Sequence, residues 1–240
     1  GDLMRGLAGG RPWILMEQTP SAVQWRRRNS PKRPGQHLLW SLARVAHGAD
    51  GILQFQWRQS RQGAETFHSG MVPHAGRHSR TWEETVATGQ ALKRLGPVLG
   101  KPVRAEAALI LDWVSQWALG AAIGPVEVGE RFEAVRAWHR SLWEAGIATD
   151  IVPVGRRLEG YRLIVVPAVF IDRPELAGHL EQAVAAGAQV IVSGPTGVVD
   201  ANAGAILGGY LGSLRPLLGV RVTDHAALTG PVGQSDPRGA

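Results

Sequence analysis

Cysteine is absent from the 240 residues, and acidic residues are scarce in the first third of the chain. Without cysteine the chain can form neither disulfides nor thiolate metal sites, which fits a cytoplasmic protein. No apolar run reaches the roughly 18–20 residues that cross a bilayer, so we expect no membrane association. Since 44% of the residues are hydrophobic and 19% are charged, the composition is that of a folded globular protein.

The shortage of acids leaves residues 1–82 basic, with 12 Lys and Arg against four Asp and Glu. The densest basic run covers residues 26–33 and could contact phosphates, as in a nucleic-acid-binding module. Pro31, Pro34 and Gly35 interrupt this part of the chain, and no recognition helix, zinc motif or aromatic RNA-stacking signature accompanies it. We therefore predict a solvated loop and no nucleic-acid partner.

Strand and helix patterns alternate along the chain. In the first part, the apolar spacing predicts strands at 11–16 and 51–57 and helices at 36–47 and 80–95. In the second part, it predicts strands at 107–111, 149–153, 161–167 and 188–193 and helices at 129–145 and 174–186. Strands separated by crossover helices predict parallel α/β sheets that are covered on both faces.

Two of the few acids of the first part occupy positions that suit catalysis. Glu17 directly follows a predicted strand, and Glu65 lies in the loop after the next one. In (β/α)₈ barrels the carboxyl ends of the strands carry the catalytic groups. The alternative is an ion pair with the plentiful local arginines. Three aromatic residues nearby could stack on a sugar or pack in a core: Trp25, Trp57 and Phe67.

The amino-acid sequences of several segments favour the catalytic interpretation over ion pairing and core packing. The segment LMEQTPSAVQW at 15–25 closely resembles the nucleophile segment of glycoside hydrolase family 42 β-galactosidases. Further resembling segments are HGADG at 47–51, FQWRQSR at 55–61, GAETFH at 63–68, PHAG at 73–76 and, more loosely, GGYLG at 208–212 and LLGV at 217–220. They occur in the right order and spacing, and the resemblance spans about residues 11–223.

This resemblance implies a fold and a site. Residues 1–103 would be the last two βα units of a (β/α)₈ TIM barrel, 104–223 a flavodoxin-like (glutamine-amidotransferase-like) trimerisation domain, and 224–240 an irregular tail or a truncated domain edge. Glu17 matches the nucleophile and Trp25 lines the galactose subsite. Glu65 and His68 match a pair that hydrogen-bonds sugar hydroxyls, which we expect to be buried. The implied full-length enzyme is a homotrimer that hydrolyses terminal non-reducing β-D-galactose residues with retention and needs no cofactor or metal for the bond cleavage.

Retention also needs a second carboxyl about 5 Å from the nucleophile. In the family this glutamate is preceded by Asn, and no Asn-Glu pair occurs in the 240 residues. We therefore expect a C-terminal fragment whose acid/base residue lies upstream of Gly1. One alternative is a catalytically silent fragment that acts only as an association domain. A second, a glutamine-amidotransferase-like enzyme, needs a nucleophilic cysteine and is set aside.

Two further segments could resemble sites. Asp112 and Trp113 follow a predicted strand, where ligand sites of α/β sheets gather, but we favour a structural or interface role. Residues 193–197 (SGPTG) faintly suggest a phosphate-binding loop. They lack the lysine and the spacing of a P-loop, so we do not expect nucleotide binding.

Overall fold

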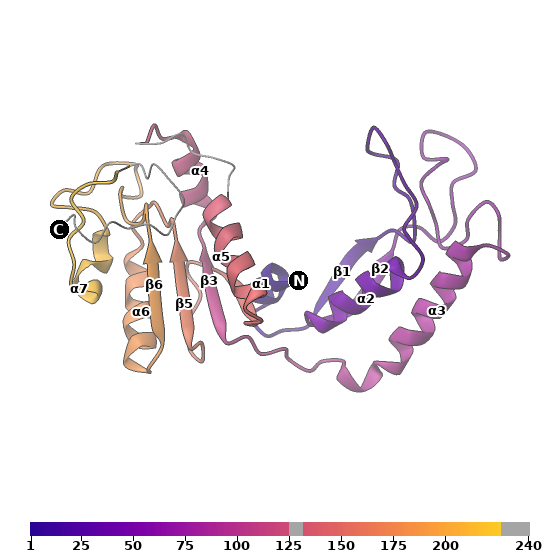
Figure 1. Ribbon diagram of the computed structural model, residues 1–240, viewed down its shortest axis with the longest axis horizontal. Coiled ribbons are helices and arrows are strands. Elements are labelled where there is room, and N and C mark those ends of the chain that lie inside the picture. Colours follow the sequence, from indigo (N-terminus) through magenta and orange to yellow (C-terminus); the bar gives the residue numbers. More distant parts are fainter. Residues whose placement is uncertain (125–131, 227–240) are drawn as a thin grey trace. The chain divides into compact units, whose positions relative to one another are not determined.

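The computed structural model describes residues 1–124 and 132–226 (Figure 1). The chain divides into two compact units, Gly1–Arg104 and Ala105–Ala240. Most of the tail predicted at 224–240, and the start of the helix predicted at 129–145, lie outside the described residues. Within the described ranges, no helix is both long enough and apolar enough to cross a membrane.

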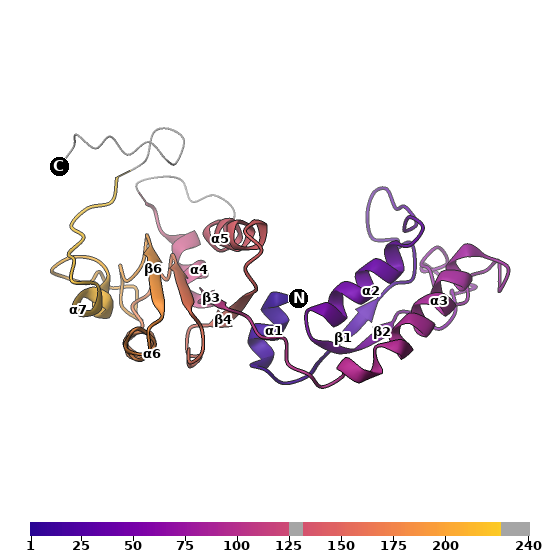
Figure 2. The ribbon, with the colours of Figure 1, turned by 60° about the horizontal axis from the view of Figure 1, so that its bottom comes forward.

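The first unit contains two strand–helix pairs, as predicted. Strands β1 (Trp13–Gln18) and β2 (Ala49–Gln54) pair in parallel. Helix α2 (Gln36–Ala46) follows β1, and helix α3 (Arg80–Arg94) follows β2 (Figure 2). Ser79 caps α3 as expected, because its hydroxyl accepts a hydrogen bond from the backbone N–H of Trp82 at 3.4 Å. A short helix that the apolar spacing did not predict, α1 (Asp2–Ala8), precedes β1, and a 3₁₀ turn (Gly96–Val98) follows α3.

A buried polar layer joins the strands of this unit to its helices. The amide of Gln18 donates to the hydroxyl of Ser41 on α2 at 2.7 Å. His37 on the same helix lies 3.2 Å from the side-chain oxygen of Gln54, and its ring is almost wholly buried. The pairing of β1 with β2 is irregular between Leu15 and Gln18. Gln18 is buried, whereas Glu17 directly before it is exposed.

The second unit is a four-stranded parallel sheet in the order β4-β3-β5-β6. Its strands are β3 (Ala107–Leu111), β4 (Thr149–Pro153), β5 (Leu163–Pro167) and β6 (Gln189–Ser193), and its helices are α4 (Trp113–Ala121), α5 (Glu133–Glu144), α6 (Pro174–Ala185) and α7 (Arg215–Leu218), with a 3₁₀ turn at Gly212–Leu214. Taken in chain order this is the arrangement 2-1-3-4 of flavodoxin-like folds, so the predicted fold class is confirmed.

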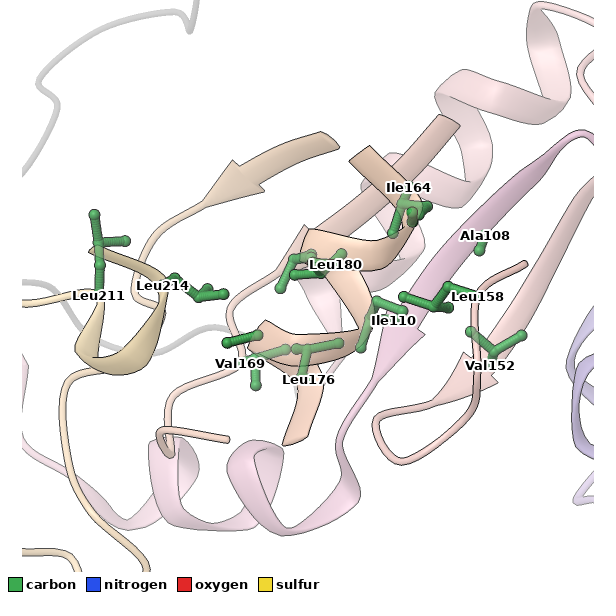
Figure 3. Packing of buried hydrophobic residues seen from close by; sticks show 13 residues of the cluster. Ala108, Ile110, Val152, Leu158, Ile164, Val169, Leu176, Leu180, Leu211 and Leu214 are labelled. Atoms are coloured by element: carbon green, nitrogen blue, oxygen red, sulfur yellow. The ribbon is translucent and has the colours of Figure 1, made fainter. Parts of the chain in front are cut away.

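Helices α5 and α6 cover opposite faces of this sheet (Figures 1 and 2). On the α6 face, Leu176 and Leu180 pack with Ile110 and Val169 in one buried cluster (Figure 3). Burying side chains of this size stabilises the fold by about 1.5–3 kcal/mol each. The cluster extends to Leu214, which anchors the chain after β6.

The two segments that could have been sites are structural. Asp112 caps α4 by accepting the N–H of Val114 at 3.2 Å, and it also accepts a hydrogen bond from Arg173 Nε at 2.7 Å. In the 193–197 loop the hydroxyl of Thr196 is buried and donates to the carbonyl of Ser193 at 2.6 Å. Because these polar groups are used within the fold, neither segment offers a free polar site.

Candidate active site

The carboxyl end of β1 presents a free acid. Glu17 lies on this strand with its side chain exposed. Its carboxylate forms no hydrogen bond and no ion pair with any residue in the described part of the chain. The alternative in which local arginines neutralise Glu17 is therefore wrong for the described residues.

Ser69 ties the chain that follows β1 to the chain that follows β2. Its hydroxyl lies 2.7 Å from that of Thr19 and accepts the N–H of Ser21 at 3.0 Å. Its own N–H donates to the carbonyl of Ala22 at 3.0 Å. These contacts link residues about fifty positions apart, so they fix where the segment after Glu17 lies relative to the 63–69 loop.

His68 and Trp25 are brought together by the same arrangement. The His68 ring is fully buried, and its centroid lies 5.2 Å from that of Trp25 and 4.9 Å from that of Phe55. His68 Nδ1 lies 3.1 Å from the carbonyl of Ser69, so Nδ1 carries the proton and donates. Nε2 has no hydrogen-bond partner among the described residues. It is the one polar atom of the ring that remains to be satisfied.

Trp25 presents a broad ring to solvent, with 64% of its surface exposed. Trp57 and Phe67 are exposed at 67% and 82%. None of the three aromatic residues packs in a core formed by the 240 residues themselves, and strand residues of the same unit such as Met16 are exposed as well. Phe67 and Ala64 line an open hollow together with Val23. Flat apolar faces at the rim of such a hollow suit stacking on a sugar ring.

Glu65 lies in the same turn as His68 but is oriented differently. Its backbone carbonyl accepts the N–H of His68 at 3.0 Å, whereas its side chain is exposed. The expectation that the two side chains form a buried pair is therefore wrong for Glu65. The reason is that residues 61–67 lie on the surface, and the chain turns inward only from His68 onward. No ion pair joins Glu65 to Arg58 or Arg61 in the part of the chain that the structure describes.

Lys32 is a buried cation next to the segment that follows Glu17. It was predicted to lie in a solvated loop, and this is wrong for Lys32 alone, since Arg26 to Ser30 are exposed or nearly so. Its ammonium group donates to the carbonyls of Thr19 and Ser21 and lies 5.1 Å from the Trp40 ring. Burial lowers the pKa of Lys32 to about 8. The cation thus supports the loop that carries Ser21.

Among residues 1–124 and 132–226, no three His, Asp or Glu side chains gather closely enough to hold a metal ion. The candidate site consists of an exposed carboxylate at a strand end, a Trp–His pair with tilted rings, and a second carboxylate on the neighbouring loop.

Residues 1–95 match the family described as "Beta-galactosidase", and residues 105–233 match "Beta-galactosidase trimerisation domain". The chain belongs to the glycoside hydrolase family 42 β-galactosidases. It is 46% identical over 230 residues to the β-galactosidase of an Arthrobacter species and 43% identical over 224 residues to β-galactosidase BgaB of a Geobacillus species. These matches cover 95% and 93% of the chain but 33% of each relative, so the chain spans about a third of their length.

Solved structures of β-galactosidases also match most of this chain. The cold-adapted β-galactosidase from Rahnella sp. R3 superposes with a TM-score of 0.87 at 39% identity, over 95% of this chain and 34% of that one. A family 42 β-galactosidase named Gan42B superposes with a TM-score of 0.82 at 37% identity, over 89% and 31%. The fold predicted for both parts of the chain, the end of a barrel followed by a trimerisation domain, is confirmed by these matches.

Three residues of the site were not predicted from the sequence. Ser69 and Lys32 act through contacts with distant segments, and a single sequence shows no signal for them. Phe55 could have been noticed, because it lies at the start of the FQWRQSR segment and directly follows β2.

Proposed function

We propose that this chain supplies part of the active site of a retaining β-galactosidase, with Glu17 as the nucleophile. The observation that carries the proposal is the exposed carboxylate at the carboxyl end of β1, together with the Trp25–His68 contact between the segments that follow β1 and β2. The relatives described as β-galactosidases support the substrate class. No nucleic acid or membrane enters the proposal, and the cytoplasmic location stays a prediction from the sequence.

The chemistry of retention assigns each side chain a task. The Glu17 carboxylate attacks the anomeric carbon, the bond to the leaving oxygen breaks, and a glycosyl-enzyme forms. Water then releases the sugar with its original configuration. The exposed ring of Trp25 offers a stacking surface for the galactose ring. His68 Nε2 and the Glu65 carboxylate are assigned to sugar hydroxyls, in particular to the axial hydroxyl of galactose. A site built to hydrogen-bond this hydroxyl strongly rejects sugars that lack it.

The acid that protonates the leaving oxygen is proposed to lie outside these 240 residues. Glu83 and Glu84 belong to α3. Glu83 lies in its first turn, and Glu84 accepts hydrogen bonds from Arg80 at 3.0 Å and from the N–H of Gly35 at 3.3 Å. Glu106 precedes β3 in the second unit. None of these acids is therefore a candidate for the second carboxyl.

A chimera tests the nucleophile. These 240 residues replace the matching stretch of Geobacillus β-galactosidase BgaB, so that the rest of the barrel comes from the relative. We expect the chimera to hydrolyse an aryl β-galactoside, Glu17→Ala to abolish turnover, and added azide to restore part of it with an inverted product. Glu83→Ala is the matched control and should retain activity. If Glu17→Ala kept most of the activity, the assignment would be wrong.

A second candidate function is association alone. It is favoured by one observation: in the described part of the chain, neither the acids of α3 nor Glu106 are suited to the acid role. In that case residues 105–233 would still form the proposed homotrimer, while the 240-residue chain would turn over no galactoside. Native mass spectrometry and a galactosidase assay on the same sample separate the two functions.

A further inference from the structure

Helix α4 buries polar side chains and exposes apolar ones, which is the reverse of an ordinary surface helix. Its polar residues Ser115 and Gln116 are buried, with 0% and 6% of their surfaces exposed. Its large apolar residues Trp113, Val114 and Trp117 are exposed at 38%, 48% and 56%. A helix that covers a sheet normally turns its apolar stripe inward. This helix presents its apolar side to the outside.

Polar contacts hold the helix in this orientation. The hydroxyl of Ser115 accepts the N–H of Ile171 at 2.9 Å and donates to Asp112 Oδ2 at 2.7 Å. The amide of Gln116 donates to the carbonyl of Ala168 at 3.2 Å. Rolling α4 to bury its tryptophans would leave these groups unsatisfied, which costs about 1–3 kcal/mol for each one. The exposed apolar side is therefore a stable feature of the unit.

The exposed side carries no charge. Residues 113–124 contain no Asp, Glu, Lys or Arg, and Ile123 is fully exposed at their end. The other exposed tryptophan of the unit, Trp143 on α5, is 66% exposed but lies beside Glu144. An uncharged apolar surface with two tryptophans has the composition of an interface core, where charged residues are depleted and Trp residues act as anchors.

We propose that Trp113, Val114, Trp117 and Ile123, the α4 face, form the surface on which copies of this chain meet. The inference rests on the proposed homotrimer and names the surface that makes it. Residues 113–124 carry no charged side chain that would have to be desolvated in an interface, and they lie within the residues that match a trimerisation domain. A second copy is the occupant that this match favours.

Native mass spectrometry and sedimentation velocity of the 240-residue chain test the proposal. Both methods separate a discrete trimer from larger aggregates. We expect Trp117→Lys to raise the concentration at which the trimer dissociates by at least about 30-fold, the effect of losing an interface anchor. Trp143→Lys is the matched control, because it changes an equally exposed tryptophan of the same unit, and the trimer should persist. Far-UV circular dichroism checks that both variants fold.

Thiol labelling measures burial of the α4 face in the trimer without breaking the interface. The chain has no cysteine, so Val114→Cys and Trp143→Cys each introduce a unique thiol. We expect a maleimide to label Cys in the Val114→Cys variant more slowly as the protein concentration rises, whereas labelling of the Trp143→Cys variant stays unchanged.

The outcomes separate this inference from the proposed function. A discrete trimer that survives Trp117→Lys, with unprotected Val114→Cys, overturns the α4 face but leaves the homotrimer standing. A chain that stays monomeric at every concentration overturns both. Loss of the trimer in Trp117→Lys but not in Trp143→Lys supports the α4 face. The nucleophile assignment is tested by the chimera and is unaffected by any of these results.

Discussion

The hydroxyl of Ser69 lies 2.7 Å from the hydroxyl of Thr19, and this contact joins the loop after β2 to the loop after β1. Through it the strand end that carries Glu17 is held to the turn that carries His68. The geometry of the candidate site therefore depends on a side chain that has no part in the proposed chemistry.

Replacing Ser69 by Ala should lower the free energy of unfolding by about 1–3 kcal/mol, because Thr19 and the N–H of Ser21 lose a buried partner. Urea denaturation of the 240-residue chain measures the change. Ser60→Ala is the control, since the Ser60 hydroxyl lies 3.5 Å from its acceptor and contributes little. Equal stability of the two variants would mean that Ser69 does not hold the loops together.

The stability of the chain should depend on pH through Lys32. Its pKa is lowered to about 8 by burial, while the unfolded chain titrates near the ordinary value of 10.5. Between these pH values the unfolded state binds more protons, so stability rises as the pH rises from about 8 towards 10.5. Lys32→Met removes this titration. We expect the wild-type chain to gain stability relative to Lys32→Met over that window, as measured by urea denaturation at several pH values. A constant difference would contradict a buried, titrating Lys32.

His37 should give a pH dependence at the acid end. Burial lowers its pKa, and its ring lies 3.2 Å from Gln54 inside the polar layer of the first unit. The unfolded chain takes up a proton near the ordinary pKa of 6.5, and the folded chain does so only at lower pH. Stability contributed by neutral His37 is thus present above pH 6.5 and lost as the pH falls below it. His37→Gln, which keeps a polar side chain, should flatten the unfolding free energy between pH 6.5 and 5. An unchanged slope would show that His37 is not buried as a neutral ring.

Glu65 should contribute to sugar selection rather than to bond cleavage. In the BgaB chimera, Glu65→Gln should lower kcat/KM for an aryl β-galactoside by about 10- to 100-fold, because a hydrogen bond to a charged group is lost. With the 4-deoxy substrate, which lacks the axial hydroxyl, the same variant should lose much less activity. Equal losses on both substrates would assign Glu65 to another hydroxyl or to structure.

The two parallel sheets were predictable because their strands are apolar runs and their helices repeat apolar residues at helical spacing. Helix α4 was missed for a physical reason. Its outer side is apolar and its inner side is polar, so the chain from Trp113 to Ala121 shows no stripe that predicts a surface helix. The orientation of α4 is set by Ser115 and Gln116, whose hydrogen-bond partners lie about fifty residues away in the sequence.

The sequence predicted the exposed residues of the candidate site but not the buried residues that hold its loops in place. The flanking segment of Glu17 and the GAETFH segment carry a family pattern that can be recognised in one sequence. The burial of Lys32 and the contacts of Ser69 depend on how distant loops meet, and a prediction from local pattern cannot supply that. For the same reason Glu65 was expected to be buried with His68, whereas the loop leaves its side chain in solvent.

The central claim, that Glu17 is the nucleophile, is tested most directly by trapping the glycosyl-enzyme. A 2-deoxy-2-fluoro-galactoside with a good leaving group is expected to form this intermediate and to hydrolyse slowly, because fluorine destabilises the oxocarbenium-like transition state. Incubated with the BgaB chimera and followed by peptide mass mapping, it should leave one fluorogalactosyl group on Glu17, and Glu17→Gln should carry none. A label found on Glu65 or on any other residue would contradict the account.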